Sequence, residues 1–134
     1  MTSFMNDIKA FHEKFGLENL DPEPKRLGTD EATFRIKFMQ EELDEFAAAE
    51  REGNLEDMAD ALVDLVYVAL GTAYLMGIPF DACWQEVQWA NMRKVRAESA
   101  ADSKRGSKFD VVKPEGWEAP DLRPLLGLDP KWTY

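Results

Sequence analysis

Residues 59–68 read ADALVDLVYV, an apolar run of helical character that two aspartates, Asp60 and Asp64, interrupt. The two side chains are four residues apart and therefore project from one face of a helix. No lysine or arginine occurs between Arg51 and Arg93, so the helix itself offers these carboxylates no ion pair. Because an ionised carboxylate in apolar surroundings is strongly disfavoured unless it is paired, the pattern favours a bound cation.

A second acidic cluster precedes this run, where residues 41–45 read EELDE. Glu41 and Glu42 are four and three residues before Glu45, so their side chains share one side of a helix. Asp57 extends the later acidic stripe, although alone it is more typical of a helix start. Taken alone, the cluster at residues 41–45 is more typical of a solvated helix face. Two acidic stripes facing each other across a helix pair supply all-oxygen ligation, which suits Mg²⁺ or Mn²⁺.

Helical periodicity and stop signals predict four helices. The expected ranges are about 4–15, 30–52, 54–76 and 81–99. Asn54 is the expected N-cap of the third helix, with Asp57 as the acidic partner in its first turn. Residues 109–112 are a candidate short strand. The predicted fold class is all-α, a small antiparallel bundle of about four main helices with an irregular C-terminal tail.

The composition predicts a single domain over residues 1–134, with a helical body to about residue 99 and a tail beyond it. A formal net charge of −10 argues against a nucleic-acid binder or an anionic-membrane binder. From residue 93 to 113, however, seven basic residues outnumber three acidic ones. The apolar segment 65–80 is shorter than the roughly 20 residues that a membrane span needs. With one cysteine, Cys83, and no secretory signal pattern, we expect a cytoplasmic protein.

Other chemistries find little support in the residues. The single histidine, His12, cannot supply the two Glu-x-x-His units of a carboxylate-bridged di-iron bundle. There is no phosphate-binding P-loop motif and no nucleophile elbow. The acidic metal site and the basic segment that follows it instead suit a polyanion carried with divalent cations.

Four features in this order carry a family resemblance: EELDE at residues 41–45, the acidic and apolar run 60–73, Asn91-Met92-Arg93-Lys94, and the tail from Gly106 to Leu122. This set resembles the MazG-like all-α nucleoside triphosphate pyrophosphohydrolase superfamily. Within that superfamily it is similar to the branch of phosphoribosyl-ATP pyrophosphohydrolase. The resemblance covers most of the chain.

The resemblance implies that Glu42, Glu45 and Asp64 are metal ligands and that Glu41 orients or deprotonates the attacking water. The second motif of the superfamily is usually Glu-x-x-Asp, and aligning its aspartate with Asp64 places Ala61 where the glutamate is expected. Two interpretations stay open at this position. Either Asp60 substitutes for the missing glutamate as a ligand, or water takes its place.

The implied activity is hydrolysis of a nucleoside triphosphate between the α- and β-phosphates, giving the monophosphate and pyrophosphate. The residues expected to contact the phosphates are Asn91 and Lys94, placed on one helix face, and Arg105, Lys108 and Lys113 from the tail. The nucleobase is expected in an apolar pocket, with Phe11, Tyr67 or Trp117 as stacking candidates.

Two alternatives remain beside this (deoxy)nucleoside triphosphate pyrophosphohydrolase of nucleotide-pool sanitation or balance. Ala61 in place of the expected glutamate leaves room for a catalytically silent helical oligomer that binds nucleotide or metal. Phosphoribosyl-ATP itself is the other candidate substrate. Relatives assemble as dimers or tetramers, and the small, aromatic-rich core of this chain predicts a homo-oligomer.

Overall fold

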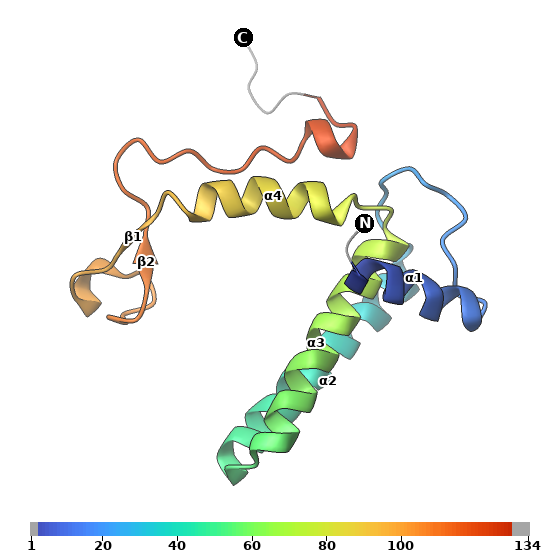
Figure 1. The fold of residues 1–134 in the computed structure, drawn as a ribbon, viewed down its shortest axis with the longest axis horizontal. Helices are drawn as coiled ribbons and strands as arrows, with labels where there is room; N and C mark the ends of the chain where they lie inside the picture. The colour runs from blue at the N-terminus through green and yellow to red at the C-terminus, as the bar shows by residue number, and fades with distance from the viewer. Residues whose placement is uncertain (1–2, 130–134) are drawn as a thin grey trace. The chain divides into compact units, whose positions relative to one another are not determined.

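The computed structural model describes residues 3–129 (Figure 1). The chain divides into two compact units, Met1–Phe80 and Asp81–Tyr134. This division groups the fourth helix with the tail, whereas the sequence suggested a helical body that reaches residue 99. The single-domain organisation stays a prediction. The all-α prediction is confirmed, because the described residues form four α-helices and only two very short strands.

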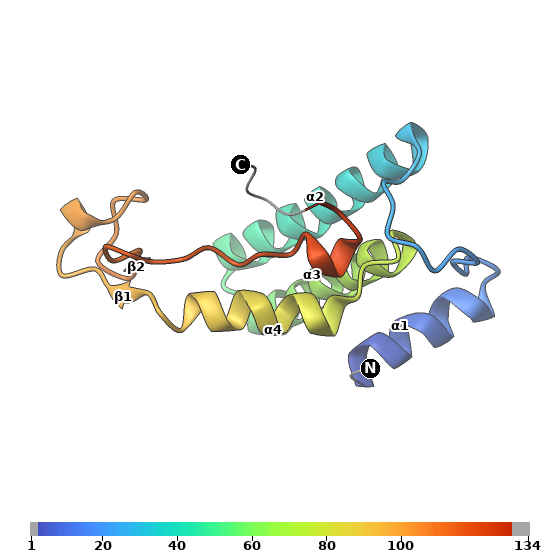
Figure 2. The ribbon, with the colours of Figure 1, turned by 90° about the horizontal axis from the view of Figure 1, so that it is seen from above.

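The first unit contains three helices, α1 (Ser3–Lys14), α2 (Thr29–Glu52) and α3 (Leu55–Leu75). Helices α2 and α3 form a long antiparallel hairpin, and α1 lies against α3 near the end that is remote from the hairpin turn (Figures 1 and 2). The core between α1 and α3 is small. Its buried members are Met5, Ile8 and Leu70, with aromatic side chains packed around them.

A two-residue link turns α2 into α3. Gly53 adopts the left-handed conformation, with φ of 67°, which costs glycine little and strains other residues. Its amide donates to the carbonyl of Glu50 at 3.1 Å. The side chain of Asn54 then accepts from the amide of Asp57 at 3.0 Å and donates to its carboxylate at 2.8 Å. The predicted N-cap is therefore confirmed.

Much of the apolar surface of this unit stays exposed. On α2, Phe34 and Leu43 are exposed. On α3, Leu62, Val63 and Val66 are exposed as well. By length and composition alone α3 could cross a membrane, a property that core helices of soluble proteins share.

The second unit contains α4 (Phe80–Asn91) from Asp81 onward and two antiparallel strands. These strands are β1 (Val95–Arg96) and β2 (Val111–Val112), with Val95 paired to Val112. The prediction that the fourth helix continues to residue 99 is wrong, because the chain leaves the helix to form this ladder. The predicted short strand is confirmed over the last two residues of its range. Single 3₁₀ turns follow at Ala100–Asp102 and Pro124–Leu126.

Candidate metal centre

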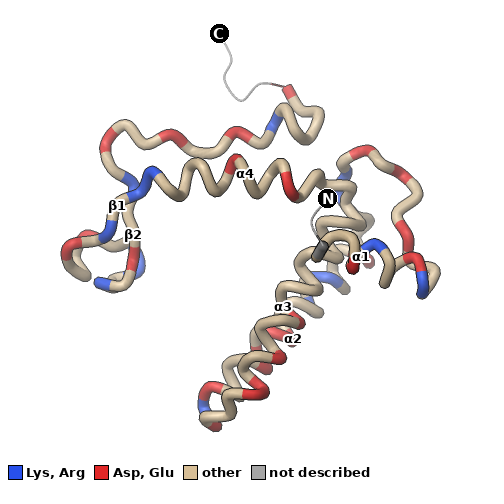
Figure 3. The backbone as a smooth tube through the Cα atoms, viewed as in Figure 1, with Lys and Arg blue, Asp and Glu red and all other residues tan. Residues whose placement is uncertain are grey.

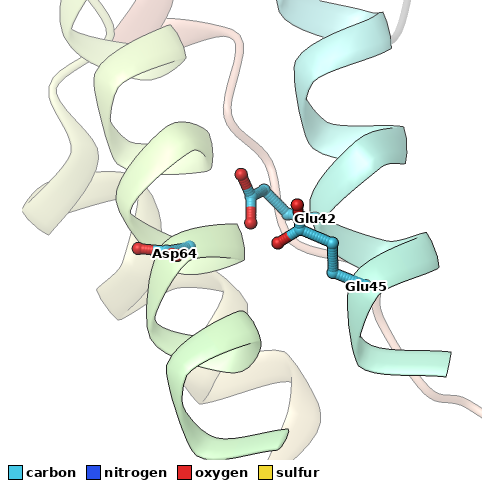
Figure 4. A group of neighbouring side chains, drawn as sticks. All are labelled: Glu42, Glu45 and Asp64. Atoms are coloured by element: carbon cyan, nitrogen blue, oxygen red, sulfur yellow. The ribbon is translucent and has the colours of Figure 1, made fainter. Parts of the chain in front are cut away.

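Three carboxylates meet in the seam of the α2–α3 hairpin. Glu42 and Glu45 extend from α2, and Asp64 comes from the facing helix α3 (Figure 4). The tight link at Gly53 fixes this pairing: at 1.5 Å per residue, Glu42 and Asp64 each lie about 16 Å along their helices from the turn.

Acidic residues lie along the hairpin, while basic residues gather around β1 and β2 of the second unit (Figure 3).

Carboxylate oxygens of Glu42, Glu45 and Asp64 lie within 4.8 Å of one another. Glu42 is buried, Asp64 is half-buried and Glu45 is exposed, so the group opens from the seam toward solvent. The Oε2 atom of Glu42 is buried and has no hydrogen-bond partner among residues 3–129. A buried acceptor without a donor costs free energy, and a divalent cation would satisfy it. The donor set, all oxygen and all anionic, therefore fits Mg²⁺ or Mn²⁺.

The pKa values of two of these carboxylates also indicate uncompensated negative charge. Burial raises the pKa of Glu42, and the hydrogen bond to Glu45 and the charges of Glu45, Asp64 and Glu41 raise it further. Burial also raises the pKa of Asp64, followed by the charges of Asp60 and Glu45. Each shift means that the negative form lacks compensating positive charge. A bound cation would supply that charge.

The other acidic residues lie outside this group. Glu41 and Asp60 are exposed and act on the group through their charges alone. Asp57 is engaged in the cap of α3. Asp44 accepts a hydrogen bond from Gln40 at 2.9 Å on the exposed side of α2.

Ala61 is buried, with 3% of its surface exposed. It lies one helical turn before Asp64, on the same side of α3. A small apolar side chain therefore occupies the helix position where the superfamily pattern has a glutamate. Asp60 is exposed and is not one of the three carboxylates that lie within 4.8 Å of one another. Its role as a ligand stays a prediction.

A buried arginine, which the sequence analysis missed, lies two helical turns before Glu42. The guanidinium of Arg35 donates to the carbonyl of Val68 at 2.8 Å and to the hydroxyl of Thr72 at 3.0 Å. Gly71 makes room for it, because a Cβ there would lie 2.7 Å from Nη2 of Arg35 and 3.0 Å from Nε2 of His12. Burial lowers the pKa of the Arg35 guanidinium and of the His12 imidazole. The available signal was Gly71 followed by Thr72 in the otherwise apolar stretch 65–75 of α3.

The predicted phosphate contacts fall in the second unit and separate into two groups. Lys94, Arg105 and Lys113 line a cavity of about 280 Å³, together with Lys104, which the sequence analysis missed. Asn91 and Lys108 are not among its lining residues. Asn91 and Lys94 do not share a helix face, since α4 ends at Asn91.

The three stacking candidates are also divided. Phe11 and Tyr67 contact each other edge to face in the first unit, with ring centroids 5.3 Å apart. Trp117 belongs to the second unit, where its indole N–H donates to the carbonyl of Ala90 at 2.7 Å.

Comparison with known families covers most of the first unit and all of α4. Residues 8–91 match the family model described as phosphoribosyl-ATP pyrophosphohydrolase, a match that spans well over half of the chain and includes the three clustered carboxylates. Comparison with curated proteins finds no match. The family implies a pyrophosphohydrolase that acts on a nucleotide-like substrate, and its members are in general metal-dependent. The chain thus belongs to the phosphoribosyl-ATP pyrophosphohydrolase family, within the MazG-like all-α nucleoside triphosphate pyrophosphohydrolase superfamily, as its motifs predicted.

Proposed function

We propose that this protein hydrolyses a (deoxy)nucleoside triphosphate between the α- and β-phosphates, using Mg²⁺ or Mn²⁺, in nucleotide-pool sanitation or balance. The observation that carries the proposal is the carboxylate group in the α2–α3 seam, with its buried and unpartnered Glu42 oxygen. The reaction adds one water across the α–β anhydride and releases the monophosphate and pyrophosphate. Such transfers need positioning and charge neutralisation more than covalent help from the protein.

Glu42, Glu45 and Asp64 would hold the cation. A bound divalent cation neutralises charge on phosphate oxygens and lowers the pKa of a coordinated water. The exposed edge at Glu45 leaves this group open to substrate and solvent. Glu41, exposed and adjacent in sequence to the buried ligand, is the proposed acceptor of the proton from the attacking water.

The family match favours a second candidate substrate, phosphoribosyl-ATP. Both substrates contain the same α–β phosphoanhydride, so the three carboxylates do not distinguish them. The two substrates differ at the base, because the adenine of phosphoribosyl-ATP bears an additional phosphorylated ribose.

Release of pyrophosphate from a panel of ribo- and deoxynucleoside triphosphates and phosphoribosyl-ATP, with Mg²⁺ or Mn²⁺, tests the proposal. We expect at least one triphosphate to be cleaved. Glu42→Gln and Asp64→Asn should each lower the rate on the order of 100-fold or more, because each removes charge from the site where the transition state is neutralised. Preference for phosphoribosyl-ATP over every triphosphate would select the second candidate.

Asp44→Asn is the matched control. It removes one negative charge from the same acidic stretch, but its side chain lies on the exposed side of α2 and is hydrogen-bonded to Gln40. Its rate should stay within about twofold of the wild type, because an isolated surface charge contributes little. Absence of cleavage across the whole panel would refute the enzyme proposal and favour a silent binding protein. Wild-type rates in the Glu42 and Asp64 variants would refute the proposal that these carboxylates carry the reaction.

A further inference from the structure

We infer that Lys104, together with Lys94 and Lys113, forms a pyrophosphate-binding pocket in the second unit, and that Arg105 holds the wall of this pocket without being a ligand contact. The choice of ligand rests on the proposed function. The pocket itself rests on the geometry of residues 94–113, and all of these residues lie beyond the family match, which ends at residue 91.

The pocket has a volume of about 280 Å³ and a cationic lining. Four of its lining residues are basic, and two, Asp102 and Asp110, are acidic. The remaining lining comes from the two valines of β2. A charged cavity of this size suits a small polyanion better than it suits a nucleobase.

Both acidic side chains accept hydrogen bonds from nearby residues of the second unit. The carboxylate of Asp102 accepts from the amides of Glu98 and Ser99, each at 3.2 Å. The carboxylate of Asp110 accepts from the hydroxyl of Ser103 at 2.6 Å and from the amide of Val111 at 2.8 Å. These contacts give the loop between β1 and β2 a defined shape.

Arg105 belongs to the same internal network. Its guanidinium donates to both oxygens of Asp110, at 3.0 and 2.9 Å, so its charge is already matched. The hydrogen bonds from Ser103 and Arg105 lower the pKa of Asp110 below its ordinary value. The predicted phosphate contact at Arg105 is thus better explained as an ion pair that braces the loop.

The lysines of the pocket are differently placed. In the part of the chain that the structure describes, no ion pair is formed by Lys94, Lys104 or Lys113. The ammonium groups of Lys94 and Lys113 lie 5.4 and 4.9 Å from the ring centroid of Trp117. Trp117 is anchored to the end of α4 through Ala90, so two cations converge on one fixed ring. Ammonium groups without carboxylate partners are available to phosphate oxygens.

Comparing Lys104 with Lys108 distinguishes binding in the pocket from a general effect of positive charge. The two lysines are four residues apart in one loop and both are exposed. Lys104 lines the pocket, whereas the ammonium of Lys108 lies over the ring of Phe109, 5.4 Å from its centroid. The family resemblance predicted Lys108 as a phosphate contact, whereas the structure places Lys104 in the lining of the pocket.

Titration calorimetry of the full chain with inorganic pyrophosphate, in EDTA so that the carboxylate site takes no part, tests the inference. The variants are Lys104→Met and Lys108→Met, each checked for an unchanged melting temperature. We expect wild-type protein to bind pyrophosphate, Lys104→Met to bind it on the order of tenfold more weakly, because one charge-assisted contact is lost, and Lys108→Met to match wild type.

Three results would overturn the inference: no binding by the wild type, unchanged binding by Lys104→Met, or equal weakening in both variants. The outcome is independent of hydrolysis. A chain that binds pyrophosphate in EDTA but cleaves no triphosphate keeps the pocket and loses the proposed function. A chain that cleaves triphosphates without this binding keeps the function and loses the pocket.

Discussion

Glu42 is the residue whose environment conflicts most with its chemistry. Folding places its carboxylate out of water and beside two other carboxylates, with one oxygen unpartnered among residues 3–129. No basic residue forms an ion pair with it in that part of the chain. A conflict of this kind at a buried side chain is typical of functional sites, where stability is given up for chemistry.

This conflict predicts a pH dependence of stability in EDTA. The folded-state pKa of Glu42 is raised above its ordinary value near 4.5, so the folded protein holds that proton more tightly than the unfolded chain. Its stabilising contribution is therefore complete below pH 4.5 and is lost as the pH rises through the folded-state pKa. Glu42→Gln carries no such proton. The melting temperature of wild type should thus fall relative to that of Glu42→Gln between pH 4.5 and neutral pH.

Thermal unfolding of both proteins over this pH range, with and without Mn²⁺, measures the effect. Mn²⁺ at neutral pH should raise the melting temperature of wild type more than that of the variant, because the variant lacks one anionic ligand. A difference between the two proteins that stays constant with pH would contradict the prediction.

At the scale of the elements, the seam between α2 and α3 depends on the missing side chain of Gly71. Alanine is normally the better helix residue by about 1 kcal/mol. Here its Cβ would lie 2.7 Å from a guanidinium nitrogen of Arg35 that is buried and hydrogen-bonded to Val68. We therefore expect Gly71→Ala to lower the free energy of unfolding by about 1–2 kcal/mol, as overpacking in a core does.

Chemical denaturation in a double-mutant cycle with Arg35→Ala measures this coupling. In the Arg35→Ala background the added methyl group meets less obstruction, so the cost of Gly71→Ala should shrink or change sign. A stabilising effect of Gly71→Ala in the wild-type background would show that the seam has more room than the structure indicates.

The element boundaries show what the sequence could predict. The first three helices end where glycine, asparagine or proline supplies a local signal, and their predicted ranges agree with the structure to within a few residues. No glycine or proline follows the fourth helix near Asn91. Its end depends on the pairing of Val95 with Val112, a contact between residues far apart in sequence. Periodicity within a short window carries no information on such a contact.

The site residues divide in the same way. The spacing of the acidic residues predicted two stripes that face each other across a helix pair. The family resemblance selected Glu42, Glu45 and Asp64 from these stripes, and the structure brings the three within 4.8 Å of one another. Their role as ligands stays a prediction. Lys104 could not be distinguished from Lys108 by sequence, because the path of the tail decides which of them lines the pocket.

At the scale of the whole molecule, the apolar surface of the first unit predicts self-association. Phe4, Leu62, Val63 and Val66, here called the apolar face, are between 47% and 69% exposed and line a cavity of about 300 Å³. Contiguous exposed apolar patches of this kind mark interaction sites. We expect a second copy of the chain to cover the apolar face, as a homodimer or as part of a tetramer.

Light scattering on wild type and on Val63→Glu measures the association. The variant places a charge in the apolar face and should reduce the mass toward that of the monomer. Leu20→Glu is the matched control, since Leu20 is 86% exposed in the α1–α2 loop and does not line the cavity. A monomeric wild type, an unchanged mass of Val63→Glu, or co-flotation of wild type with lipid vesicles would each contradict the prediction.

The anchoring of Trp117 has an optical consequence. Its ring is held by Ala90 while two ammonium groups lie against it, and indole emission is sensitive to nearby charge. A phosphate that draws those ammonium groups away would change the fluorescence of this ring without moving it. With the other tryptophans replaced by phenylalanine, the protein would report the filling of its own basic pocket as a change in emission, with no added dye.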